Sequence, residues 1–285
     1  TMNRRQFLRR TITGTLAATL SPHLMMCSTA NNRQLDEIGI ITNTIQKPLE
    51  QDYEKTLEQI AEIGYNMLEF GGHYGPSKQS FMELLKRLNI KPIAGGTSMD
   101  PLLKEPEKHI EEQLSMNKKY LVCYWPWLSS AENLTTDDCK KAAENLNQVG
   151  EKCQKAGIRF AFHNHDMEFK TTPEGDIPFD ILLQNTEPDL VTTQIDLYWI
   201  KKGGGDPIAY FNKYPGRFEL CHVKDMDDTP KRDFACVGSG IIDFPKIFAQ
   251  SETAGIKHYI VEHDDPANHM ECARTSYNYL AGVRF

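Results

Sequence analysis

The feature that most constrains the fold is a regular alternation of short apolar runs with amphipathic segments, at a period of about 30 residues. Strands that alternate with helices predict parallel pairing, because each return to the sheet needs a helical crossover. Eight such units within roughly 245 residues predict a single (β/α)₈ TIM barrel over residues 36–285. The expected strands are 38–41, 67–70, 91–96, 120–124, 158–163, 191–195, 218–223 and 258–261.

Helix signals fall between these runs. Gly64, Gly157 and Gly255 each follow an amphipathic segment and predict its C-terminal end. The expected helices are 53–63, one beginning at 77, 105–118, 135–156, 177–186, 207–213, 244–254 and 268–280. A doubly wound sheet is the competing fold, but the first strand continues as Ile40-Ile41-Thr42 and lacks the glycine-rich phosphate-binding turn.

Polar residues gather where the expected strands end. The C-terminal ends of barrel strands meet on one face, which carries the active site in barrel enzymes. The residues concerned are Glu69 and His73 after the second strand, His163, His165 and Glu168 after the fifth, Asp196 after the sixth, His222 and Lys224 after the seventh, and Glu262 after the eighth. The pattern predicts one shared polar site.

Mixed carboxylate and imidazole side chains from separate strands suit one divalent ion such as Mn²⁺, Mg²⁺, Zn²⁺ or Co²⁺. Such an ion polarises a carbonyl and stabilises an enediolate, so that a nearby carboxylate or imidazole can remove a carbon-bound proton. Trp125 and Trp199 lie beside the same strand ends. They are explained equally well as core residues and as faces on which a sugar ring stacks, so we treat them, with Glu69 and His73, as candidate substrate-binding residues.

The ordered motifs at the strand ends resemble those of the xylose-isomerase-like TIM-barrel superfamily, in the branch labelled sugar phosphate isomerase/epimerase. They include His163-Asn164-His165, Gln194-Ile195-Asp196, His222-Val223-Lys224-Asp225 and Val261-Glu262-His263-Asp264. The resemblance covers roughly 36–283. It implies a divalent ion held by Glu, Asp, His and Glu from the ends of strands five to eight, with the two glutamates, here Glu262 and the alternative Glu168, transferring protons.

Carried over residue by residue, Asp196, His222 and Glu262 match the last three ligands of that family. Where many relatives have Glu-Asn-His at the fifth strand, this chain has His163-Asn164-His165. The resemblance therefore leaves two alternatives for the first ligand, Glu168 or His163. With Glu168 on the ion, His163 or His165 is a candidate general base, Glu262 also transfers protons, and Lys224 polarises a substrate oxygen.

The resemblance implies a metal-dependent isomerase or epimerase that acts on a sugar or keto-sugar through proton abstraction and an enediolate. A lyase or dehydratase acting on a 3-keto-glycoside or inosose by the same first step is the alternative. A sugar-binding lipoprotein without catalytic activity is a third hypothesis.

Residues 1–30 have the pattern of an export signal and are left out of the fold. Arg4 and Arg5 form a twin arginine before Phe7-Leu8, and a short apolar region follows. This predicts twin-arginine export to the periplasm. Cys27 is the residue that a lipid anchor would modify, and both a lipidated and an unlipidated product stay open. Because sugar phosphates are cytoplasmic, an exported enzyme is expected to act on an unphosphorylated substrate.

The formal net charge of −7 disfavours a nucleic-acid partner, which needs a basic surface. We expect a small-molecule sugar partner, membrane contact only through a lipid on Cys27, and no readable oligomeric state. The seven cysteines are widely spaced and include no CxxC pair, and Cys123 and Cys221 fall in apolar strands. The sequence therefore predicts no disulfide framework.

Overall fold

The structure, a computed structural model, describes residues 33–128 and 133–285. The predicted export signal and Cys27 lie outside the described residues, so export and lipidation stay predictions.

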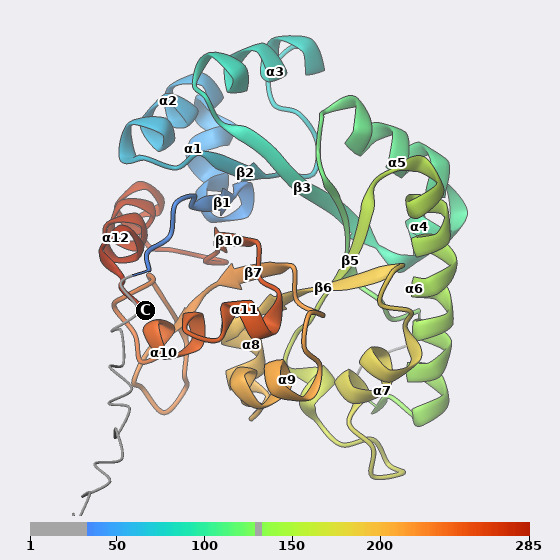
Figure 1. Ribbon diagram of the computed structural model, residues 1–285. Helices are drawn as coiled ribbons and strands as arrows, with labels where there is room; N and C mark the ends of the chain where they lie inside the picture. The colour runs from blue at the N-terminus through green and yellow to red at the C-terminus, as the bar shows by residue number, and fades with distance from the viewer. Residues whose placement is uncertain (1–32, 129–132) are drawn as a thin grey trace, which may run out of the picture. The chain divides into compact units, whose positions relative to one another are not determined.

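Eight parallel strands close into a barrel, and the helices lie around it (Figure 1). Around the barrel the strands follow the order β1, β10, β7, β6, β5, β4, β3, β2. Each barrel strand therefore pairs with the barrel strands before and after it in the sequence, and β10 closes the barrel by pairing with β1. The (β/α)₈ prediction is confirmed. The strands are β1 (Gly39–Ile41), β2 (Met67–Glu69), β3 (Lys91–Ser98), β4 (Tyr120–Trp125), β5 (Arg159–His163), β6 (Val191–Asp196), β7 (Leu220–Val223) and β10 (His258–Val261).

The outer helices begin and end at the expected local signals. Asp52 caps α2 through the amide of Lys55, and Thr135 forms a capping box with Asp138 at the start of α6. Gly157 ends α6 with a positive φ of 81°. The α-helices are α1 (Gln46–Gln51), α2 (Tyr53–Ile63), α3 (Lys78–Arg87), α4 (Met99–Lys104), α5 (Pro106–Ser115), α6 (Thr136–Ala156), α7 (Pro178–Asn185), α8 (Leu197–Lys202), α9 (Pro207–Lys213), α10 (Phe244–Phe248), α11 (Ser251–Ala254) and α12 (His269–Gly282).

Two expected helices differ from the structure. The segment expected as 105–118 follows a separate helix α4, and α5 begins at Pro106 and ends at Ser115. Pro106 has no amide N–H to donate, so it begins a helix readily and does not continue the preceding one. The segment expected as 244–254 is two short helices, α10 and α11. A small hairpin of β8 (Asp225–Met226) and β9 (Phe234–Ala235) was not predicted.

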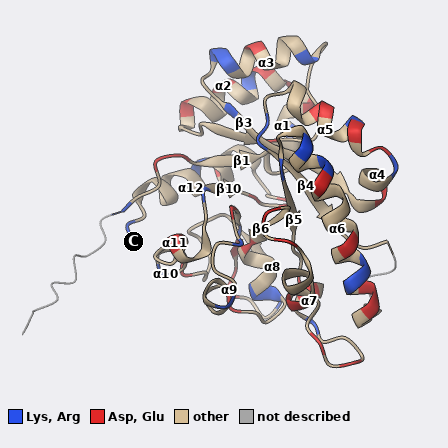
Figure 2. Ribbon diagram, turned by 45° about the vertical axis from the view of Figure 1, so that its right-hand side comes forward, with Lys and Arg blue, Asp and Glu red and all other residues tan. Residues whose placement is uncertain are grey.

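Two apolar layers hold the barrel. The larger lies between strands and helices, and a smaller cluster includes Ile93, Val122, Ala161 and Ile260 from four barrel strands. Figure 2 shows outer helices such as α6 carrying both charge signs, with the strands largely uncharged. No helix in the two described ranges combines the length and apolarity that a membrane span requires.

The prediction of no disulfide was wrong at one pair. Cys236 and Cys272 form a disulfide, with Cα atoms 5.3 Å apart and a sequence separation of 36 residues. The pairing depends on how the loop after β9 meets α12, which no local spacing reports. Cys123 and Cys221 are buried free thiols, as their apolar strands predicted.

Candidate active site

Four side chains from adjacent strand ends meet in one buried group. His163 ends β5, Asp196 ends β6, His222 lies on β7 and Glu262 follows β10. One potential ligand atom from each lies within 4.8 Å of the others. The parallel register produces this meeting, because it pairs Asp196 directly with His222. We refer to these four residues as the central group.

Hydrogen bonds to their neighbours leave His163 and Asp196 each with an electron pair that faces the other residue. His163 Nδ1 lies 3.0 Å from Gln194 Oε1, which makes Nδ1 the donor and leaves Nε2 as the free lone pair, 4.0 Å from Asp196 Oδ2. Asp196 Oδ1 accepts the amide N–H of Trp199 at 2.8 Å and so caps α8. Asp196 Oδ2 has no hydrogen-bond partner among the described residues, although it is buried.

Burial and charge set the protonation of the central group. Burial raises the pKa of Asp196 to about 7 and lowers the pKa of His163 well below its ordinary value. Burial opposes the charge on His222, but Glu69 and Glu262 outweigh it and raise the pKa of His222 to about 10. The carboxylates of Glu69 and Glu262 thus stabilise a positive charge that lies between them.

These features fit a divalent ion. A buried carboxylate oxygen without a partner, a neutral imidazole and a further imidazole between two carboxylates form the mixed oxygen and nitrogen set that such ions accept. The residues that would hold it are the four of the central group.

Glu69 contacts the ring of His222 but is not itself a member of the central group. Its Oε2 accepts Gln194 Nε2 at 2.8 Å and lies 3.1 Å from His222 Nε2, and its Oε1 accepts Tyr124 Oη at 2.6 Å. Glu69 is fully buried, so the structure places this expected substrate-binding residue behind the imidazole. A carboxylate in this position fixes the ring orientation of a metal-binding histidine.

Glu168, expected as a metal ligand, lies outside the central group. Its Oε1 accepts Trp127 Nε1 at 2.8 Å, and its Oε2 accepts the amide of His165 at 2.7 Å. The 3₁₀ turn η3 (Met167–Phe169) carries Glu168 back toward its own loop. The geometry therefore favours the other alternative from the sequence, in which His163 provides the fifth-strand ligand.

This placement gives Glu168 a measurable effect on stability. Burial, which outweighs its hydrogen bonds, raises the pKa of Glu168 from 4.5 to about 7. The folded state therefore holds this proton more tightly than the unfolded chain, and stability falls as pH rises from about 4.5 to about 7. We expect Glu168→Gln to remove this decline. Relative to wild type, the variant gains about 3 kcal/mol in free energy of unfolding between those pH values.

Urea unfolding of both proteins across this pH range measures the difference. A constant difference between wild type and Glu168→Gln would contradict the assignment of a buried, neutral-preferring carboxyl. Lys170→Gln, which removes an exposed salt bridge to Asp166 on the same loop, is the matched control and is expected to show no such pH dependence.

Lys224 lies at the rim of the central group. Its Nζ is 3.5 Å from Glu262 Oε2 and 2.7 Å from Asp264 Oδ2, and it lies 5.0 Å from the ring centroid of Trp199. Burial opposes its charge, but Glu262, Asp196 and Asp264 outweigh it and raise the pKa of Lys224. Burial likewise opposes ionisation of Glu262, but Lys224 and His222 hold the pKa of this carboxyl well below its usual value.

His165 lies between two tryptophans. Its ring centroid is 5.4 Å from that of Trp125 and 5.6 Å from that of Trp199. Its Nδ1 is buried without a hydrogen-bond partner in the described ranges, and burial lowers the pKa of His165 to about 4. These three side chains form an aromatic wall beside the central group. His73, the remaining expected residue, is exposed on the loop after β2.

Three supporting residues received no role from the sequence: Tyr124, Gln194 and Asp264. Gln194 holds His163 Nδ1 and Glu69 together, and Trp127 fixes Glu168. Gln194 and Asp264 each lie two residues from a member of the central group. Period-two alternation puts Gln194 and Asp196 on the same side of β6, and this is the signal that could have identified Gln194.

A model of the xylose isomerase-like TIM-barrel family matches residues 57–281. The chain belongs to this family. An inosose dehydratase from Lacticaseibacillus casei is 24% identical over 270 residues, covering 81% of this chain and 89% of its own.

Solved structures show the same relation. One from Parabacteroides distasonis, described as a sugar phosphate isomerase/epimerase, is 26% identical with a TM-score of 0.73 and covers 89% of this chain and 94% of its own. The IOLI protein, whose structure contains a zinc atom, has a TM-score of 0.66 at 16% identity, covers 85% of this chain and 95% of its own, and shares the fold. The named relatives thus include both a dehydratase and an isomerase/epimerase.

Proposed function

We propose that the protein removes a proton beside the carbonyl of an unphosphorylated keto-sugar or keto-cyclitol and then eliminates a group from the next carbon. The observation that carries this proposal is that Glu262 joins the central group beside Lys224, whereas Glu168 is turned away. Epimerisation by two glutamates needs one glutamate on each face of the substrate. In this site the fifth-strand position of the central group is His163, so the second glutamate is missing there.

The central group supplies the site for one divalent ion, held by His163, Asp196, His222 and Glu262. When bound, such an ion polarises the substrate carbonyl and acidifies the adjacent C–H bond.

Glu262 takes the proton in this proposal. Its carboxyl stays ionised because Lys224 and His222 hold its pKa well below its usual value. The C–H bond breaks, a C=C bond forms, and the C–O bond to the leaving group breaks. The proton on Glu262 then passes to the departing oxygen on the same face, with the Lys224 ammonium hydrogen-bonded to that oxygen. One carboxylate therefore serves both proton transfers.

The aromatic wall orients the substrate. The faces of Trp125 and Trp199 stack on an apolar sugar face. Lys224, the cation at the rim, is already paired with Glu262 and Asp264, which leaves little charge for a phosphate. This agrees with the unphosphorylated substrate expected from the export signal.

Epimerisation is the second candidate, favoured by the 26% identity to the Parabacteroides structure described as a sugar phosphate isomerase/epimerase. It requires a second proton-transfer group. The unpartnered Nδ1 of His165, on a different strand end from Glu262, is the side chain available for that role.

Product analysis in deuterated water separates the candidates. Protein loaded with Mn²⁺, Co²⁺ or Zn²⁺ is incubated with an inosose, a 3-keto-glucoside and free ketoses, and the products are followed by NMR and mass spectrometry. We expect an unsaturated ketone together with released water or alcohol. A stereoisomer of unchanged composition carrying one deuterium would indicate epimerisation. Binding without deuterium uptake or product would overturn catalysis and leave the sugar-binding hypothesis.

A further inference from the structure

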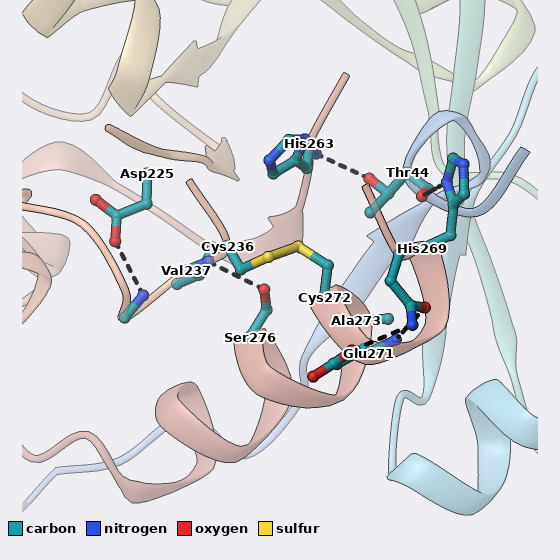
Figure 3. Close-up of a disulfide and its surroundings, with 12 residues drawn as sticks. Thr44, Asp225, Cys236, Val237, His263, His269, Glu271, Cys272, Ala273 and Ser276 are labelled. Atoms are coloured by element: carbon teal, nitrogen blue, oxygen red, sulfur yellow. Dashed lines mark hydrogen bonds between the residues drawn. A yellow bond between two sulfur atoms is a disulfide. The ribbon is translucent and has the colours of Figure 1, made fainter. Parts of the chain in front are cut away.

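A second group of potential metal ligands is separate from the central group. Cys236 follows β9, His263 follows β10 and Cys272 lies on α12. One ligand atom from each lies within 4.8 Å of the others. Figure 3 shows the His263 ring beside the disulfide that joins the two cysteines.

His263 has an unused nitrogen. The residue is only 7% exposed, and its Nδ1 has no hydrogen-bond partner within the described part of the chain. Its position is fixed from two sides: its backbone amide donates to Thr44 Oγ1 at 3.0 Å, and its ring packs against Phe234 at 5.7 Å between centroids. A buried imidazole nitrogen without a partner is costly unless it binds something.

The two cysteines are held in place by more than their disulfide. The carboxylate of Asp225 accepts the amides of Gly238 at 2.9 Å and Gly240 at 3.0 Å, which fixes the loop that carries Cys236. The amide of Val237 donates to Ser276 Oγ on α12 at 3.0 Å (Figure 3). The Val237 bond joins the loop to α12 independently of the disulfide, so we expect both sulfur atoms to stay close to His263 after reduction.

The group is reachable from outside. Cys236, His263 and Cys272 line a cavity of about 460 Å³, together with the acidic residues Asp265 and Glu271. Cys236 is partly exposed. A reductant and a metal ion can therefore reach the sulfur atoms from the cavity, and the carboxylates attract the cation.

We propose that Cys236, Cys272 and His263 form a redox-controlled metal site that exchanges a disulfide for a bound Zn²⁺ ion. A dithiol reductant supplies two electrons and two protons, so the S–S bond breaks, two thiols form and the dithiol closes to its own disulfide. Zn²⁺ then binds the two sulfur atoms and the His263 imidazole, and the two thiol protons are released. Water from the cavity takes the fourth position.

The oxidised and reduced states exclude each other. A disulfide sulfur carries no thiolate charge, so the oxidised pair does not bind the ion, and a bound Zn²⁺ protects the thiolates from oxidation. The ligand set of two thiolates and one imidazole is one that Zn²⁺ favours, whereas the central group contains only oxygen and nitrogen ligands.

Cobalt titration distinguishes the two sites by their absorption spectra. Thiolate ligation to Co²⁺ produces a charge-transfer band in the near ultraviolet, and oxygen and nitrogen ligands do not produce this band. Full-length protein is stripped of metal and divided into an oxidised sample and a sample reduced with a dithiol, which is then removed without oxygen. We expect the reduced protein to bind one more Co²⁺ per chain than the oxidised protein and to show the band.

Variants assign the band to these residues. Reduced Cys272→Ser is expected to lose the band, and Asp196→Asn, altered only in the central group, to keep it. His263→Gln retains both cysteines and is expected to bind Co²⁺ at this site at least about tenfold more weakly. Absence of the band in reduced wild type would overturn the proposal, as would its persistence in Cys272→Ser. If Cys272→Ser does not fold, the comparison of oxidised with reduced wild type and His263→Gln still decides.

Discussion

Glu262→Gln, assayed at a metal concentration that saturates the site, is expected to lower kcat by about 10³-fold, because the change removes the group that takes and returns the proton. Glutamine has nearly the shape of glutamate and keeps an oxygen toward His222 and Lys224, so the fold is expected to persist. Turnover of the substrate identified by NMR measures the effect. The same variant is also expected to stop deuterium uptake from solvent, since proton removal precedes departure of the leaving group.

Asp264→Asn is the matched control for this variant. Asp264 lies two residues from Glu262, and both carboxylates form ion pairs with Lys224. The distance from Lys224 Nζ to Asp264 Oδ2 is 2.7 Å, but the side chain of Asp264 is about one third exposed. We expect Asp264→Asn to retain the bound metal and to lower kcat by less than about tenfold. Equal losses in the two variants would show that the pairing of Lys224, rather than the base, controls turnover. Full activity in Glu262→Gln would remove Glu262 from the mechanism.

Asp196→Asn is expected to weaken metal binding more than about 100-fold and to abolish turnover at limiting metal. Loss of even an outer partner costs about 10- to 100-fold in affinity, and here a direct carboxylate ligand is lost. The substitution isolates the ligand role. Asparagine still caps a helix, so the bond to the amide of Trp199 at the start of α8 can persist. Calorimetric titration with Mn²⁺ or Zn²⁺ of the oxidised protein measures the change.

Asp206→Asn provides the comparison. Asp206 also caps a helix, α9, through the amide of Ile208, but it does not belong to the central group. Its replacement is expected to leave affinity and turnover within about twofold. Unchanged metal affinity in Asp196→Asn would contradict the proposed ligand set.

The barrel and the meeting of strand ends could be predicted from the sequence because both follow from short-range patterns. Apolar runs separated by helices dictate parallel strands, and parallel strands place their C-terminal ends on one face. Asp196, His222 and Glu262 needed nothing more to be brought together.

The roles of His163 and Glu168 could not be separated in this way. His163 ends β5 and Glu168 lies five residues further on, and the difference depends on the turn at 167–169, which directs Glu168 to Trp127 in the loop after β4. The disulfide is a similar case. Cys236 and Cys272 meet through the packing of a loop on α12, to which no periodic pattern points.

The most direct test of the proposed metal site is a crystal structure of the protein soaked with Mn²⁺, with the ion located by anomalous scattering. We predict one ion in the barrel within about 2.0–2.4 Å of His163, Asp196, His222 and Glu262, with Glu168 still bonded to Trp127. An ion coordinated by Glu168 instead of His163, or no ion among the strand ends, would show that the four residues of the central group are not the ligands.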